Sequence, residues 1–164
     1  MAFHSKNRFE SWLPALFDGE FAWDFLDPAW KGTKIKPMDF DAVIERRKHF
    51  LVFETKIPGK DIEKGQRITL TELWRTGFFT IIVLSGKKPE EINGMAIYAE
   101  GKSDGSEVGS KKLEICNAYD VIFRVRCWFC WASGDPIPTR DEWDNELFLW
   151  DYDRAWEVND SARG

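Results

Sequence analysis

Two apolar runs that are separated by one charged pair constrain the fold of this chain more than any other feature. Residues 40–46 and 49–57 are rich in β-branched and aromatic side chains, and only Arg47 and Lys48 lie between them. This pattern predicts an antiparallel β-hairpin. If the turn is centred on these two residues, paired positions satisfy i + j = 95. The sequence therefore predicts a partner and a face for each hairpin side chain.

The open end of this hairpin collects acidic side chains. The register sets Asp41 opposite Glu54 and Asp39 opposite Lys56. Because side chains alternate between faces along a strand, all four should project from one face. Facing Cβ atoms lie about 4.5–5.5 Å apart, so two carboxylates could share one hard cation such as Mg²⁺. The alternative is a solvated strand face on which Lys56 makes an ordinary ion pair.

The rest of the chain has hydrophobic spacing typical of a mixed α/β protein. The helix that follows the hairpin should be capped by Asp61, bury Ile62 and Leu70, and stop at Gly77. The other expected elements are a helix at 8–17, strands at 78–84 and 95–99, a mobile loop at 101–112, and a buried helix at 117–132, for which a strand is the alternative.

Length and composition predict one folded domain. The chain has 164 residues, 43% of them hydrophobic, which is enough for a single core. We assign residues 1–134 to this domain and residues 135–164 to an acidic, aromatic C-terminal extension, either a wrapping helix or an arm. The first thirty residues contain no long apolar stretch, and the three cysteines are an odd number. We therefore expect a cytoplasmic protein without membrane contact.

Charge is distributed unevenly along the chain. The net charge is −5, but residues 135–164 hold nine acidic and three basic side chains, which leaves the remainder at +1. Between residues 31 and 75, eleven basic side chains outnumber seven acidic ones. A local excess of positive charge around the hairpin is what a phosphate-binding surface needs, although solvated surface charge is the plain alternative.

Three ordered motifs carry a family resemblance. They are Pro37-Met-Asp-Phe-Asp, Phe50-Leu-Val-Phe-Glu-Thr-Lys and Gly65-Gln. Together they resemble the PD-(D/E)xK nuclease superfamily, in particular its small single-domain phage, repair and restriction nucleases. The resemblance covers residues 37–84 and implies a restriction-endonuclease-like core, a mixed sheet in α-β-β-β-α-β order. The first strand of that core would fall at residues 33–36.

The resemblance also implies roles for the hairpin residues. Asp41 and Glu54 would bind Mg²⁺ or Mn²⁺ together with the backbone carbonyl of Thr55. Lys56 would orient or activate the attacking water. Asp39 is a second acid at a ligand position, and we rank it after Asp41 because the strand begins directly after Asp41.

Further site candidates lie outside the hairpin. Gln66 precedes Leu70 by four residues, so it should face inward and support the catalytic lysine or a phosphate; a surface amide is the alternative. Some members of the superfamily also use an acid on the first helix, for which Glu10 and Glu20 are the candidates. Cys127 and Cys130 have metal-binding or redox spacing, but no second pair completes a zinc set, so we assign them to the core.

The implied activity is metal-dependent hydrolysis of phosphodiester bonds in nucleic acid, with DNA as the first expectation. A homodimer is compatible with the sequence. The main alternative is a non-catalytic protein on the same fold, which binds DNA or docks to another protein through the aromatic, acidic tail as a regulator or inhibitor.

Overall fold

The computed structural model describes Ala29 and residues 38–149, with the backbone alone for residues 146–149. The chain divides into two compact units, Met1–Asp39 and Phe40–Gly164, and the fold described is that of the second unit. The expected helix at 8–17 and strand at 33–36 lie outside the described residues. The expected boundary at residue 134 falls within the second unit and stays a prediction.

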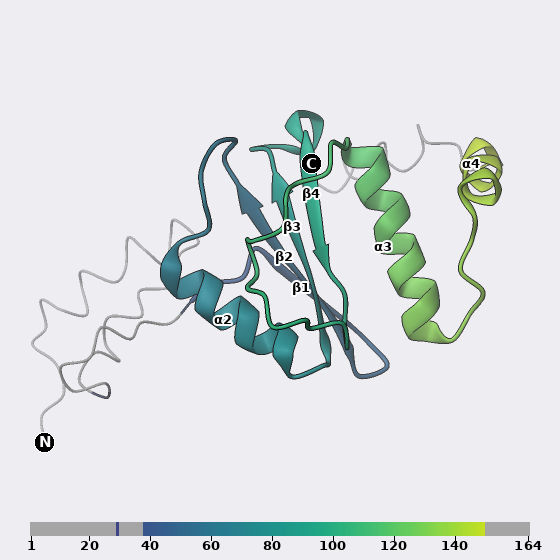
Figure 1. The fold of residues 1–164 in the computed structure, drawn as a ribbon. Coiled ribbons are helices and arrows are strands. Elements are labelled where there is room, and N and C mark those ends of the chain that lie inside the picture. Colours follow the sequence, from purple (N-terminus) through teal and green to yellow (C-terminus); the bar gives the residue numbers. More distant parts are fainter. Residues whose placement is uncertain (1–28, 30–37, 150–164) are drawn as a thin grey trace, which may run out of the picture. The chain divides into compact units, whose positions relative to one another are not determined.

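The second unit is a mixed α/β fold, with a four-stranded sheet and three α-helices in the described range (Figure 1). The expected hairpin, buried strand, following strand and helix near 117–132 are all confirmed. None of the described helices has the length and apolar content that a membrane crossing requires. In chain order the elements are β1 (Ala42–Arg46), β2 (His49–Lys56), α2 (Lys64–Arg75), β3 (Phe79–Ser85), the 3-10 helix η2 (Pro89–Glu91), β4 (Gly94–Tyr98), α3 (Ala118–Ser133) and α4 (Arg140–Leu149).

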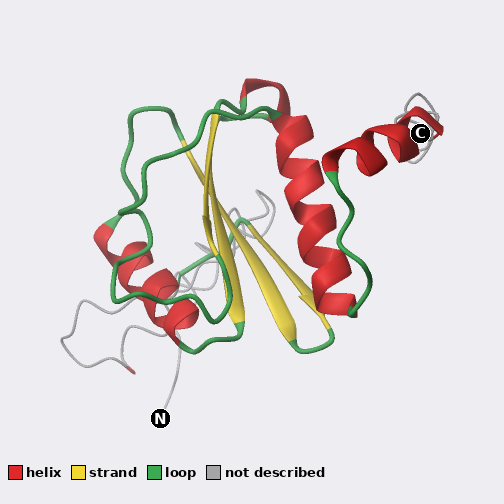
Figure 2. Ribbon diagram, turned by 45° about the vertical axis from the view of Figure 1, so that its right-hand side comes forward, coloured by secondary structure: helices red, strands yellow, loops and turns green. Residues whose placement is uncertain are grey.

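The sheet has the order β1-β2-β3-β4. Strands β1 and β2 are antiparallel, β2 and β3 are parallel, and β3 and β4 are antiparallel. A parallel pair needs a crossover connection, which α2 supplies. Helix α2 covers one face of the sheet and α3 the other (Figure 2). Side chains that alternate along β2 therefore point in turn toward α2 and toward α3.

The α3 face of the sheet holds an apolar core. Its members come from β2, β3, β4, α3 and the segment just before α3, and are Leu51, Ile82, Leu84, Met95, Cys116, Val121, Trp128 and Ala132. Helix α3 begins with a capping box between Asn117 and Asp120 and ends at Gly134, which has a φ of +74°. That left-handed backbone suits glycine and stops the helix. These two caps set where α3 begins and ends, and so which of its residues pack on the sheet.

The helix after the hairpin begins later than expected. Helix α2 starts at Lys64, its N-cap is Glu63, and no side chain caps it, so the prediction that Asp61 is the cap is wrong. Ile62 is buried before the helix begins. The start of α2 therefore depends on where the chain reaches the core after it leaves β2. The capping residue near the turn did not predict this start.

The stretch 101–112 is anchored to the α2 face, in contrast to the expected mobile loop. Val108 is fully buried, and its N–H donates to Thr71 Oγ1 over 2.9 Å. The Tyr98 hydroxyl accepts N–H groups from Gly109 at 2.7 Å and from Lys111 at 2.9 Å. These polar anchors, which come from α2 and β4, join segments far apart in the sequence.

Candidate functional site

The register of the hairpin is the one that the sequence predicts. The ladder runs from Arg46 paired with His49 to Ala42 paired with Phe53, so every pair satisfies i + j = 95. The turn residue Arg47 has a φ of +50°, which is typical of a two-residue turn of the primed type. The ladder ends at Ala42, the first residue of β1, and one further step of the same register would set Asp41 opposite Glu54.

The Asp41 carboxylate closes the open end of the hairpin. Its Oδ2 accepts the backbone N–H of Thr55 and the Thr55 hydroxyl, each over 2.6 Å. On β2 the N–H of Phe50 points to β3, so by alternation the N–H of Thr55 points to β1. The Asp41 carboxylate therefore takes the next donor of the ladder, and the Thr55 carbonyl should point to the same side.

Glu54 is a buried carboxylate at the end of the central strand pair. Its exposure is only 2%, and its register partner on β3 is Val83. The Lys56 ammonium lies 2.5 Å from Oε1, whereas Oε2 has no hydrogen-bond partner in the described part of the chain. A buried polar atom without a partner costs free energy, and such an atom often marks a place for a missing ligand.

The pKa of Glu54 is raised above its ordinary value of 4.5. Burial is the largest cause, because it disfavours the charged form, and the nearby charge of Asp41 acts in the same direction. The Lys56 ammonium and the Gln66 amide act in the opposite direction. The effect of Asp41 on the pKa of Glu54 agrees with the neighbouring positions that the hairpin register gives these two acids.

Lys56 is held between the sheet and α2. Its Nζ donates to Gln66 Oε1 over 2.8 Å while it pairs with Glu54. The lysine side chain is only 15% exposed. An ammonium has three N–H donors, and these contacts use two of them, which leaves one for a substrate or a water.

Gln66 reaches the site because of its place on α2. It lies four residues before Leu70, which is fully buried against the sheet, so both residues are on the inward face. The inward placement that the spacing to Leu70 predicts is confirmed by the contact of Gln66 with Lys56 on β2. Gln66 thereby connects the helix to the charged pair on the strand.

The donor set suits one hard cation with water among its ligands. The candidate ligands are two carboxylates, Asp41 and Glu54, and the Thr55 backbone, and Mg²⁺ is commonly held by one or two carboxylates and several waters. In the described range, no group of three or more Asp, Glu, His or Cys side chains is placed to hold a metal ion. A cation at this site would therefore depend on water or substrate oxygens for most of its ligands.

The other site candidates are not part of this cluster. Asp39 is exposed and is the last residue of the first unit, so its role stays a prediction. Glu10 and Glu20 lie outside the described residues. Cys130 is buried in α3, as expected for a core residue, and Cys127 is half-buried.

Sequence reasoning did not single out the burial of Glu54 or the role of Asp41 in closing the ladder. The only signal for the first was the apolar run of β3, which the structure sets beside β2 in parallel. No family model, curated protein or solved structure matches this chain.

Proposed function

We propose that this protein is a metal-dependent nuclease that hydrolyses phosphodiester bonds of nucleic acid, with DNA as the first substrate to test. The observation that carries the proposal is the buried Glu54 carboxylate, which has one oxygen on Lys56 and the other without a partner. A protein with a buried ion pair is usually no more stable than one with apolar residues of similar volume in its place. The presence of the pair therefore calls for a reason other than stability. A catalytic role on a restriction-endonuclease-like core, as the sequence motifs imply, is such a reason.

The roles follow from the contacts of each residue. Asp41 and Glu54, with the Thr55 carbonyl, would hold Mg²⁺ or Mn²⁺, which would supply a water of lowered pKa and neutralise phosphate charge. Lys56 has one N–H free of the contacts described, and this group can donate to the attacking water or to a phosphate oxygen. Gln66 fixes the position of the Lys56 ammonium, so we assign it as a positioning residue.

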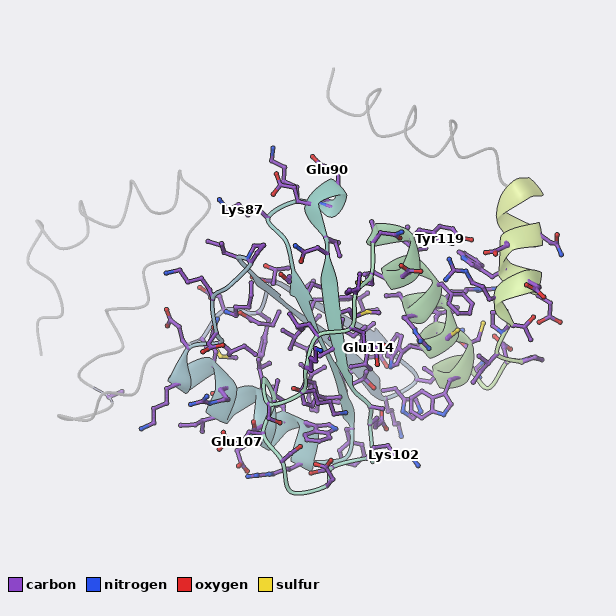
Figure 3. The ribbon with its side chains drawn as sticks, turned by 45° about the horizontal axis from the view of Figure 1, so that its top comes forward. Lys87, Glu90, Lys102, Glu107, Glu114 and Tyr119 are labelled. Carbon is purple, nitrogen blue, oxygen red and sulfur yellow. The ribbon has the colours of Figure 1, made fainter. Side chains whose placement is uncertain are left out.

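The location of the cluster also favours ligand binding. Glu54 and Lys56 lie at the carboxyl end of β2, and β3 runs parallel beside it with Ser85 in register with Lys56. In open α/β sheets, ligands bind outside the carboxyl ends of parallel strands. Exposed lysines follow both strand ends, Lys60 after β2 and Lys87 after β3. Figure 3 shows Lys87 projecting outward beside Glu90 at this end of the sheet.

One observation favours a non-catalytic protein as the second candidate. The Lys56 ammonium is already paired with Glu54 and bonded to Gln66, as it would be in a purely structural ion pair. A protein of this kind would bind DNA or another protein without cutting. The two candidates make opposite predictions for metal dependence.

The test uses the full chain with linear, nicked, branched and single-stranded DNA, in Mg²⁺, Mn²⁺ or EDTA. Asp41→Asn is the main variant, because Asp41 is exposed and an asparagine oxygen can accept the same two hydrogen bonds. We expect it to lower kcat about 100-fold or more, the scale for losing one charge-stabilising group. The matched control is Glu72→Gln, an exposed carboxylate on α2 that should leave cleavage unchanged.

Metal binding is measured separately from cleavage. If Asp41 and Glu54 hold a cation, Mn²⁺ should raise the melting temperature of the wild type and of Glu72→Gln but not of Asp41→Asn. Full activity in Asp41→Asn would contradict this site. No cleavage by the wild type on any substrate, together with DNA binding that is independent of metal, would favour the non-catalytic candidate.

A further inference from the structure

The hairpin tip carries a cluster of cations away from the candidate active site. Arg46, Arg47 and Lys48 follow one another where β1 turns into β2, and the last two are exposed. Both turn residues have positive φ angles, +50° for Arg47 and +71° for Lys48. Residues other than glycine are strained at positive φ angles, by roughly 1–2 kcal/mol per residue. The usual sequence of such a turn is Asn-Gly. Two long cations at these positions therefore call for a reason other than turn stability.

Part of the reason is structural. The Arg47 guanidinium donates to the carbonyl of Ser133, the last residue of α3, and Arg46 Nε donates to the Ser133 hydroxyl over 2.7 Å. Cations near a helix C-terminus are favourable, because carbonyl groups there lack helical partners. Lys48 differs: among the described residues, its backbone N–H is bonded to the Glu45 carboxylate and its ammonium has no partner.

Two exposed aromatic rings flank this cluster. Trp131 is 43% exposed and Phe129 is 37% exposed, and both belong to the last turns of α3. The Arg46 guanidinium lies over the Phe129 ring, 4.8 Å from its centroid. The His49 and Trp131 ring centroids are 4.6 Å apart. Arg46 and His49 are a cross-strand pair, so the two ring contacts are made from one rung of the ladder.

The His49 ring beside Trp131 is held in place. His49 is bonded through Nδ1 to both carboxylate oxygens of Glu100, at 2.9 and 3.0 Å. Glu100 is itself fixed, because its N–H donates to Thr80 Oγ1 over 3.1 Å. The orientation of the imidazole beside the Trp131 ring is thus set by two strands. Rings that are held in advance lose little conformational entropy when a ligand stacks on them.

The basic character continues along α3. Arg124 is exposed and lies seven residues before Trp131, which places it two turns away on the same helical face. The surface formed by Arg46, Arg47, Lys48, His49, Phe129, Trp131 and Arg124 thus combines aromatic faces with spaced positive charges. We call it the tip surface.

We propose that the tip surface binds single-stranded nucleic acid, with a base stacked on Trp131 and phosphates contacted by Lys48 and Arg47. Aromatic platforms with cations along a groove or face are the general means of binding single strands. A duplex keeps its bases stacked on each other, so it would use the cations and not the ring. This site lies at the opposite end of β2 from Glu54 and does not depend on cleavage.

The test measures binding of the full chain to a fluorescein-labelled oligo(dT) by anisotropy in EDTA, so that cleavage does not interfere. We expect Trp131→Ala to weaken binding about tenfold, the scale for losing one stacked base, and Trp131→Phe to restore most of the affinity. Lys48→Ala should lower the slope of log affinity against log salt by about 0.7, the value for one phosphate contact on a single strand. A duplex of equal length should bind more weakly.

Matched controls separate this surface from the rest of the molecule. Lys112→Ala removes an exposed lysine outside the tip surface, and Ile115→Ala removes a side chain that belongs to a residue 96% exposed. Both should bind oligo(dT) as the wild type does. Wild-type affinity in both Trp131→Ala and Lys48→Ala, with folding verified by circular dichroism, would overturn the proposal. So would the absence of oligo(dT) binding by the wild type, which would instead point to a protein partner.

Discussion

The two ends of one hairpin differ in how they use charge. At the open end, the buried Glu54 and the largely buried Lys56 are compensated by each other and by α2. At the tip, Arg47 and Lys48 are exposed cations on a strained backbone next to α3. Between the two ends Leu51 is fully buried. The apolar middle of β2 stabilises the fold. The polar residues at the two ends of the hairpin have features that stability does not explain, and functional residues are expected at such places.

The largest effect should come from breaking the buried pair. Lys56→Ala leaves Glu54 as an uncompensated buried charge, so the free energy of unfolding should fall by about 3–5 kcal/mol in urea denaturation. The double variant Glu54→Leu with Lys56→Met removes both charges and should leave stability unchanged or raise it by up to about 4 kcal/mol. It should also abolish any cleavage. If the double variant were less stable than Lys56→Ala, the pair would be mainly structural.

The middle of the strand should respond to lost volume. Leu51→Ala should lower the free energy of unfolding by about 2–5 kcal/mol, because it leaves a cavity in the apolar core on the α3 face. Val43→Ala on β1 is the control, since Val43 is 49% exposed and its loss should have a small effect. Equal losses in the two variants would contradict the assignment of the core to the α3 face.

The pH dependence of stability should report the burial of Glu54. Its pKa is raised above 4.5, mainly by burial. Between its pKa values in the unfolded and the folded protein, the folded state binds more protons, so stability falls as pH rises. Relative to Glu54→Gln, the wild type should therefore lose stability from about pH 4.5 upward and reach a constant difference above the folded-state pKa. Urea midpoints across this range measure it, with Glu72→Gln as the control.

The smallest effect should be at the tip. Lys48→Gly removes the strain of a positive φ angle, and the gain in the free energy of unfolding should be about 1 kcal/mol. The same change should weaken oligo(dT) binding. Lys48→Ala is the matched control, because it removes the charge and keeps the strain of the positive φ angle. It should weaken oligo(dT) binding without raising the free energy of unfolding. A loss of stability in Lys48→Gly would mean that Lys48 makes structural contacts.

The sequence by itself determined the local features of this site. The position of Arg47 and Lys48 set the hairpin register from Ala42 to Phe53, and this register predicts Asp41 next to the end of the ladder, near Glu54. The spacing from Gln66 to Leu70 set the inward face of α2. Register and helical face depend on backbone geometry over a few residues, so a single sequence is sufficient to predict them.

The tertiary structure alone decided the environment of these residues. Glu54 is buried because β3 lies parallel to β2 and α2 covers that face, and the raised pKa follows from this burial. The start of α2 at Lys64 and the aromatic flank of Trp131 at the hairpin tip likewise come from segments distant in the sequence. Burial and electrostatics are set by non-local packing, which hydrophobic periodicity does not encode.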